Sequence, residues 1–195
     1  MIESFADKAT AQIFEGEYSR RLPGDIQARA KIKLTTIHLA TELQHLIHPT
    51  SNNLEALTGN LNGFHSIRIN KQWRIIFHWE NGNAHNVKIT DYHPTMTAKQ
   101  TIPLLNPFAE TLSEIIEESS LSQKDFATAC GIIPSHISEM KHGKRRITPV
   151  HDLRLSRLLG MSPGFFLRLQ LHHDLELANL RHSKEINRIR PPQLA

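Results

Sequence analysis

Two hydrophobic periods divide the first half of the chain. Between residues 25 and 46, apolar side chains recur every three or four positions, and this spacing predicts one helix that buries a stripe along its length. The stripe consists of Ile26, Ala30, Leu34, Ile37 and Thr41, with Leu39, Leu43 and Leu46 beside it. A shorter helix is predicted over residues 6–14. We expect both helices to pack against a common core.

From residue 67 onward the hydrophobic period changes to two. The alternating positions are Ile67 and Ile69, then Trp73, Ile75, Phe77 and Trp79, then Val87 and Ile89. They predict three antiparallel strands joined by turns at 70–72 and 81–83, and the Asn-Gly pair in the second turn is a strong hairpin signal. Because strand side chains alternate between faces, Arg68 and Arg74 should point away from the apolar row. The sheet can therefore pack helices on one face and present cations on the other.

The pattern changes again at the junction Asp91-Tyr92-His93-Pro94-Thr95-Met96-Thr97, where the last predicted strand stops. The following residues have little periodic signal and contain Pro103, so we interpret 94–106 as a connector. A helix is predicted from about 108 to 119. We therefore expect two small domains, 1–93 and 107–195, near the lower end of the sizes that sustain their own core.

Residues 121–145 have the spacing of a helix-turn-helix motif. Ser122 can cap the first helix, with the acidic Asp125 three residues later. Gly131 supplies the turn, and Pro134 suits the first position of the second helix. The positions expected to face the core are Phe126, Ala127, Cys130, Ile137 and Met140. The side chains left pointing outward, toward a DNA major groove, are Ser135, Ser138, Glu139 and His142.

Six leucines follow the motif, and we expect them to lie on two helices. They are Leu167, Leu169, Leu171, Leu175, Leu177 and Leu180. Some of them should pack in the core. A symmetric operator would need two motifs about one DNA turn apart, and a homodimer formed through this region is our hypothesis.

Charge is unevenly placed along the chain. Residues 1–95 contain 10 Lys and Arg against 9 Asp and Glu, whereas residues 96–195 contain 13 against 10, so most of the net charge of +4 lies in the second half. The dense tract Lys141-His142-Gly143-Lys144-Arg145-Arg146 follows the motif and suits contact with DNA phosphates. The alternative is a solvated basic turn.

Other features of the composition exclude whole classes of protein. A single cysteine, Cys130, excludes an internal disulfide framework and a cysteine-based zinc site. The 13 histidines are scattered without metal-ligand spacing, so we expect no metal and no cofactor. No leading apolar stretch has the length of a signal peptide or a membrane span, so we expect a cytoplasmic protein without a membrane partner.

The stretch from Leu57 to Phe77, together with Asp91-Tyr92-His93, resembles the HigB branch of the RelE-like toxins over nearly all of residues 1–93. The resemblance implies a ribosome-dependent endoribonuclease that cuts mRNA. In such an enzyme Arg68 and Arg74 would bind phosphate, and Asp91 and His93 would transfer protons. Tyr92 would be available to stack on a base. Without the resemblance, Arg68 and Arg74 could equally be ordinary solvated strand residues, and Asp91 and His93 would be interpreted as polar residues at a strand end.

One departure from that family affects the expected activity. Other members can carry His and Lys in the loop before the glycine, where this chain has Glu55 and Thr58. An acid at this place would repel RNA phosphate. An alternative function is therefore a catalytically weak or inert toxin-like domain that serves a transcriptional repressor.

The motif at 121–145 and the segments 147–149, 153–170 and 174–178 resemble the HigA branch of phage-repressor-like antitoxins. The resemblance implies that Gln123 meets DNA near a phosphate and that base edges lie closest to Ser135, His136 and Glu139. It also implies phosphate contacts, which we assign to Lys141, Lys144 and Arg145. Ile133 and Pro134 occupy places where polar residues are common, so direct base readout should be sparse.

The sequence thus predicts an α+β RelE-like domain, with helices on a small antiparallel sheet, followed by an all-α helix-turn-helix domain. The expected function is a single-chain toxin–antitoxin in which the second domain neutralises the first and represses its own operon. The partners would be the ribosome with its mRNA and the operator DNA. A further alternative is a merged or artificial reading frame in which Met96 is a true start.

Overall fold

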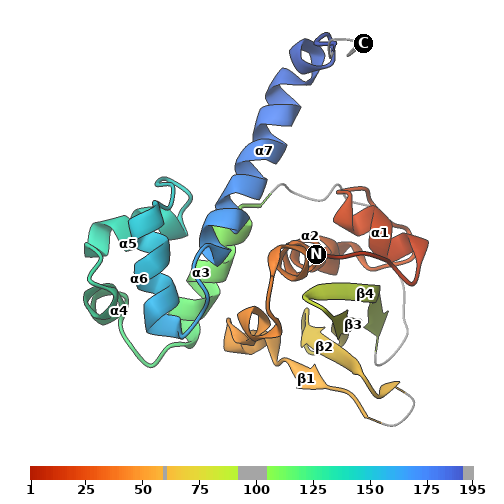
Figure 1. The fold of residues 1–195 in the computed structure, drawn as a ribbon, viewed down its shortest axis with the longest axis horizontal. Helices are drawn as coiled ribbons and strands as arrows, with labels where there is room; N and C mark the ends of the chain where they lie inside the picture. Colours follow the sequence, from red (N-terminus) through yellow and green to blue (C-terminus); the bar gives the residue numbers. More distant parts are fainter. Residues whose placement is uncertain (59–60, 92–104, 191–195) are drawn as a thin grey trace.

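The protein folds around two separate hydrophobic cores, one in each half of the chain (Figure 1). The structure is a computed structural model and describes residues 1–58, 61–91 and 105–190. One core is built from residues between 9 and 89, and the other from residues between 108 and 169. The predicted connector 94–106 lies outside the described residues except for Leu105 and Asn106.

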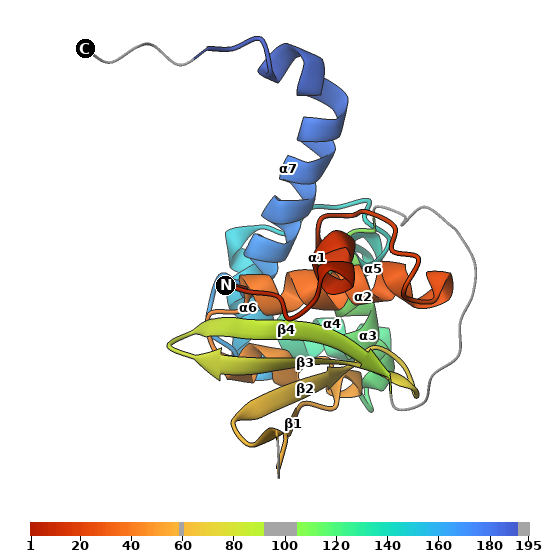
Figure 2. The ribbon, with the colours of Figure 1, turned by 90° about the vertical axis from the view of Figure 1, so that its right-hand side faces the viewer.

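The first half is an antiparallel sheet with helices on one face (Figure 2). Its helices are α1 (Lys8–Phe14), α2 (Gly24–Leu39) and the short 3-10 helices η1 (Leu43–Ile47) and η2 (Thr50–Asn52). Its strands, in the spatial order β1-β2-β3-β4, are β1 (Glu55–Ala56), β2 (Phe64–Arg68), β3 (Trp73–Glu80) and β4 (Asn83–Asp91). Helices α1 and α2 cover one face of this sheet.

Alternation along β3 explains why helices pack on one face only. Trp73, Ile75 and Phe77 are buried under α2, whereas Arg74 and Ile76 are half-buried on the opposite face. The turn into β4 places Asn81 and Gly82 at φ 50° and 78°, the left-handed backbone that Asn-Gly accepts most readily in a two-residue hairpin. The predicted strands, turns and division of faces are confirmed.

The sheet has one strand more than the sequence pattern predicted. Glu55 and Ala56 form the edge strand β1 and pair with Ser66 and His65 of β2. The three predicted strands are present as β2, β3 and β4, and within the described residues the sequence pattern missed only this fourth strand. Two residues are too few to show a period, so β1 exists because β2 offers it an open edge and not because of its own pattern.

The long helix α2 ends at Leu39, and the prediction that it runs to about Leu46 is wrong. Ala40 takes an extended backbone, with ψ 132°, and the chain then re-enters a short 3-10 helix at Leu43. This break returns Leu46 to the first core while Leu39 packs against the second core. Contact between the two halves therefore overrides the local helical spacing.

The second half is entirely helical in its described part. It contains α3 (Pro107–Glu118), α4 (Gln123–Cys130), α5 (Pro134–Lys141), α6 (Pro149–Leu159) and α7 (Phe165–Ile186). The Ser122 side chain accepts a hydrogen bond from the Asp125 N–H at the start of α4, and Pro134 is the first residue of α5. The predicted capping and the predicted helix near 108–119 are confirmed.

Helix α7 carries all six leucines that we expected to lie on two helices, so that prediction is wrong. The 22 residues from Phe165 to Ile186 contain no glycine or proline that could end the helix. The far part of α7 projects away from the rest of the molecule (Figures 1 and 2). Leu171, Leu175 and Leu180 are exposed on it.

Candidate active site and nucleic-acid interface

Arg74 lies at the centre of a network on the face of the sheet away from the helices. Its Nε donates a hydrogen bond to Ser66 Oγ over 2.9 Å, and its Nη2 donates to the Asn53 carbonyl oxygen over 2.9 Å. The same Nη2 lies 2.9 Å from Oε2 of Glu55. With only 13% of its side chain exposed, Arg74 is held in one place by three partners.

A pocket of about 290 Å³ opens beside Arg74. Its lining comes from all four strands and the loop after β1: Glu55, Leu57, Leu61, Ser66, Arg74, Ile76, Thr90 and Asp91. The pocket thus joins a cation that suits phosphate, a carboxylate that can exchange a proton, and an apolar wall. A fixed cation and a carboxylate are two of the groups that catalyse cleavage of a phosphodiester.

The other predicted catalytic residues have different positions. Asp91 ends β4 and accepts a hydrogen bond from Gln72 Nε2 over 3.0 Å. Arg68 ends β2 opposite Arg74 in the register, so the two side chains share a face, and Arg68 is exposed. Tyr92 and His93 lie outside the described residues. The structure therefore brings Arg68, Arg74 and Asp91 to the same end of the sheet.

Three partners of Arg74 were not predicted from the sequence as its ligands. Ser66 could have been found from the strand register, because it lies two residue pairs along from the Arg68–Arg74 pair and therefore on the same face. Asn53 takes a left-handed backbone, with φ 44°, in the loop before β1, and no sequence period marks that position. Glu55 was expected to repel RNA, and the structure shows that it pairs with Arg74, the arginine predicted to bind phosphate.

In the helix-turn-helix motif, α5 presents the predicted outward face. Ile137 and Met140 are buried, Ser135 is exposed, and His136 and Glu139 are half-buried. The His136 ring packs edge-on against His151, with 5.8 Å between the ring centroids. Burial, followed by the neighbouring His136, lowers the pKa of His151.

Some of the predicted DNA contacts have partners within the protein. Arg145 Nε lies 2.6 Å from Oε2 of Glu139, and Lys141 Nζ lies 3.9 Å from Oε1 of Glu117. Lys144 is exposed on the turn after α5, and Gln123 is half-buried at the start of α4. A DNA phosphate could therefore bind Lys144 directly, whereas Arg145 would first have to break its ion pair with Glu139.

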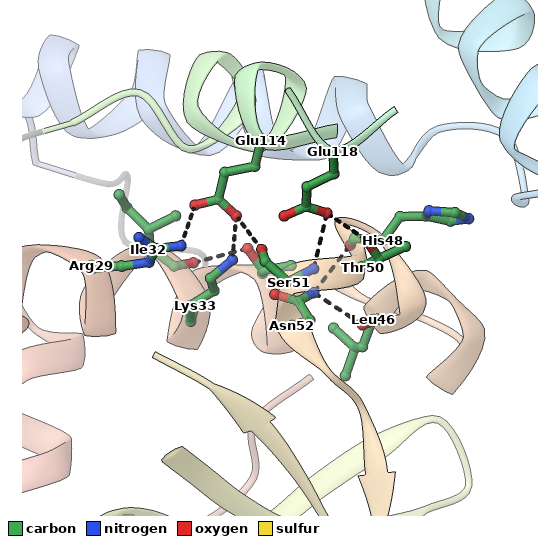
Figure 3. A network of polar contacts seen from close by, with 11 residues as sticks. Arg29, Ile32, Lys33, Leu46, His48, Thr50, Ser51, Asn52, Glu114 and Glu118 are labelled. Carbon is green, nitrogen blue, oxygen red and sulfur yellow. Dashed lines mark hydrogen bonds and ion pairs between the residues drawn. The ribbon is translucent and has the colours of Figure 1, made fainter. Parts of the chain in front are cut away.

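The two halves meet through a polar contact between α3 and the helical side of the first domain (Figure 3). Lys33 Nζ lies 2.6 Å from Oε2 of Glu114, and Arg29 Nη2 lies 3.3 Å from the other carboxylate oxygen. Lys33 is 2% exposed. Desolvation lowers the pKa of Lys33, while the carboxylate of Glu114 acts in the opposite direction.

One turn further along α3, Glu118 repeats this arrangement with uncharged donors. Its Oε2 accepts hydrogen bonds from Thr50 Oγ1 over 2.8 Å and from the Ser51 N–H over 2.9 Å. Both donors belong to η2 (Figure 3). Two carboxylates on α3 are thus matched to donors on α2 and η2.

A second group of contacts joins α7 to the end of α2. Arg168 Nε donates to the Leu39 carbonyl oxygen over 3.0 Å, and Lys31 Nζ lies 2.7 Å from Oε1 of Glu176. The rings of His45 and Phe165 have their centroids 5.0 Å apart. The helical domain therefore rests on α2, η1 and η2, and of these α2 packs on the face of the sheet opposite Arg74.

No helix in the described part of the chain is both long and apolar enough to cross a membrane. Residues 1–58, 61–91 and 105–190 also contain no group of three or more His, Cys, Asp or Glu side chains placed to hold a metal ion.

Comparison with known proteins identifies both halves of the chain. Residues 3–93 match the family of the RelE-like toxin of the type II toxin–antitoxin system HigB, and residues 112–166 match a helix-turn-helix family. The chain is 40% identical over 87 residues to Toxin HigB-1 of Vibrio cholerae, a match that covers 44% of this chain and 92% of that protein.

Two further relatives extend this comparison. The chain is 33% identical over 93 residues to the Endoribonuclease HigB of Proteus vulgaris, covering 48% of this chain and all of that protein. It is 32% identical over 81 residues to the uncharacterized HTH-type transcriptional regulator YddM of Escherichia coli, covering 42% of this chain and 84% of that protein. The predicted fold class is confirmed. The chain therefore belongs to the HigB-like family of RelE-like toxins through residues 3–93, and it joins that toxin domain to a helix-turn-helix domain in one polypeptide.

Proposed function

We propose that this protein is a single-chain toxin–antitoxin. Its first domain is a ribosome-dependent endoribonuclease that cleaves mRNA, and its second domain neutralises the first and represses transcription of its own operon. The observation that carries the proposal is the pocket that Arg74 and Asp91 both line, within a domain whose relatives include an Endoribonuclease HigB.

The proposed reaction is attack by a ribose 2′-hydroxyl on the adjacent phosphorus. A base removes the 2′-hydroxyl proton, the new P–O bond forms a phosphorane, and the bond to the 5′-oxygen breaks as an acid protonates that oxygen. Asp91 and His93 are our candidates for the two proton transfers. Arg74 and Arg68 would offset the charge that develops on the phosphorane, and Tyr92 would stack on a base.

We infer that neutralisation acts through the contact with α2 and η2. Tethering raises the effective concentration of the helical domain to roughly millimolar, so the contact forms even if the separate domains bind weakly. The Lys33–Glu114 part of the contact lies on α2, on the helical side of the sheet, while the Ser51–Glu118 part lies two residues before Asn53, whose carbonyl oxygen binds Arg74. Neutralisation would then come from the added bulk, which keeps the toxin domain out of a confined site on the ribosome.

For repression, we propose that α5 enters the major groove of operator DNA. Ser135, His136 and Glu139 would lie nearest the base edges, and the phosphate contacts would come from Gln123, Lys141, Lys144 and Arg145. Two copies would bind one symmetric operator through a dimer formed along α7, where Leu171 and Leu175 are exposed. Since both nucleic acids occur in the cytoplasm, we place the protein there.

The test is to express residues 1–95, the same fragment with Arg74→Ala, and the full chain. Growth arrest by the first alone, with mRNA cleavage on translating ribosomes, is the expected result. A soluble and folded fragment that leaves growth and mRNA intact would refute the nuclease. In a gel-shift assay, the full chain should bind DNA from upstream of its gene specifically, and the binding should weaken as salt is added.

A second candidate function is repression assisted by an inert toxin-like domain. The pairing of Glu55 with Arg74 favours it, because a neutralised arginine binds phosphate poorly. Under this function the fragment 1–95 would fail to cleave mRNA, while the full chain would still bind operator DNA.

A further inference from the structure

The position of Glu55 in the pocket goes beyond the roles proposed so far. We propose that Glu55 is a positioning residue that competes with RNA phosphate for Arg74 and thereby sets the affinity of the pocket for RNA. This inference rests on the proposed function, because it takes RNA as the ligand of the pocket.

The contacts of Glu55 place its carboxylate where a phosphate would bind. Glu55 and Ser66 are partners in the register of β1 and β2, so both side chains lie on the face that carries Arg74. Glu55 Oε2 is 2.9 Å from Arg74 Nη2, and Glu55 also lines the pocket. An anionic oxygen that approaches Nη2 of Arg74 must therefore share or replace this contact.

The other contacts of Arg74 do not compete in the same way. The Asn53 carbonyl and the Ser66 hydroxyl are uncharged acceptors, and they fix the direction of the guanidinium without cancelling its charge. If Glu55 moved aside, Arg74 would keep these two partners and remain aimed at the pocket. The arginine is thus preorganised, and Glu55 is the part that a phosphate can replace.

Glu55 is also placed so that it can move. Half of its side chain is exposed, and ion pairs this close to water are weak. Its other carboxylate oxygen accepts a hydrogen bond from the Asn53 side chain, which offers the displaced carboxylate a partner. Strand β1 has two residues and pairs with β2 alone, so a small shift there disturbs little of the sheet.

The inference is tested on the full chain by fluorescence anisotropy with a labelled single-stranded RNA oligonucleotide at low salt. We expect Glu55→Gln to bind roughly threefold to fivefold more tightly than the wild type, because it removes the competing charge and keeps the side-chain size. Glu55→Asp should bind like the wild type. Glu80→Gln, which removes the same charge from the far end of β3, should change affinity far less.

The tighter RNA binding expected of Glu55→Gln must depend on Arg74. Glu55→Gln combined with Arg74→Ala should therefore bind RNA no more tightly than Arg74→Ala alone. Equal or weaker binding by Glu55→Gln, with weaker binding by Arg74→Ala, overturns the competition and leaves the proposed RNA site intact. If Arg74→Ala leaves the affinity for RNA unchanged, both the competition by Glu55 and the proposed RNA site are overturned. Thermal unfolding of each variant checks that these differences do not come from a loss of fold.

Discussion

The pairs Lys33–Glu114 and Arg74–Glu55 join the same kinds of charged group in different surroundings. Lys33 is almost fully buried between two domains and shares Glu114 with Arg29 and Ser51. Glu55 is half exposed at the rim of a pocket. A buried pair is costly to break because it leaves a charge without a partner in a dry place, whereas an exposed pair can exchange its partner. The first pair can therefore hold domains together, and the second can regulate a site.

The largest expected effect comes from breaking the buried pair. Glu114→Ala leaves Lys33 buried without its carboxylate, and we expect a loss of about 3–5 kcal/mol in the stability of the contact between domains. Hydrogen exchange in α2 and α3 measures this loss. Lys33→Met combined with Glu114→Leu should restore much of it, because an apolar pair leaves no uncompensated charge.

The matched control for this prediction lies on the same helix. Glu117 is 70% exposed and is 3.9 Å from Lys141, so Glu117→Ala should change the contact by less than about 1 kcal/mol. If Glu114→Ala and Glu117→Ala have the same small effect, Lys33–Glu114 does not hold the domains together.

Removal of Arg74, the arginine of the exposed pair, should slow the cleavage of mRNA. Arg74→Ala in the fragment 1–95 is expected to lower mRNA cleavage on translating ribosomes by about 100-fold to 1,000-fold, because it removes a fixed positive charge from the transition state. Arg20→Ala, on an exposed loop of the same domain, is the control. Undiminished cleavage by a folded Arg74→Ala fragment would place the active site elsewhere.

The contact between domains should also weaken in acid. Burial lowers the pKa of His45, which packs on Phe165 and faces Glu42, Arg168 and Asp152. Between this lowered pKa and the ordinary value near 6.5, the separated form takes up more protons, so the contact loses stability as pH falls. The protection factors of the η1 amides, which are corrected for the pH dependence of intrinsic exchange, should fall on the order of severalfold from pH 7.5 to 5.5.

A variant without the titrating ring separates His45 from the other histidines. His45→Gln should reduce this acid response, even if it weakens the contact at every pH. An unchanged response would assign the acid sensitivity to another buried histidine, such as His173.

The smallest effect is expected when the exposed pair is broken. Glu55→Gln should change the free energy of unfolding of the full chain by less than about 1 kcal/mol. Denaturant unfolding measures this free energy for Glu55→Gln and, for comparison, for Glu114→Ala. A loss as large as that of Glu114→Ala would remove the difference between the two pairs and make Glu55 a structural residue.

The sequence predicted best those parts of the fold that depend on local spacing. Apolar alternation located β3 and its turn, and Ser122, Gly131 and Pro134 located the motif, because each acts on the backbone within a few residues of itself. The predictions failed where distant contact decides the structure. Helix α2 ends early because Leu39 and Leu46 belong to different cores, and β1 exists only through β2.

The candidate site shows the same division. Strand alternation placed Arg68 and Arg74 on one face, and the junction placed Asp91 at the end of a strand. The partners of Arg74 come from a loop and an edge strand, whose approach depends on the folded sheet. For that reason the sequence could show that Glu55 is an acid near the site, but not that it pairs with Arg74.

Cleavage of the connector in the purified full chain tests the central claim most directly. A specific protease site is inserted within residues 94–104, and the cut and uncut proteins are diluted into a translation extract. The uncut chain should leave translation intact, and cutting should cause inhibition, since dilution removes the benefit of tethering. The same cut in an Arg74→Ala chain should be harmless. A cut chain that separates into its two domains and still leaves translation and mRNA intact would contradict the account.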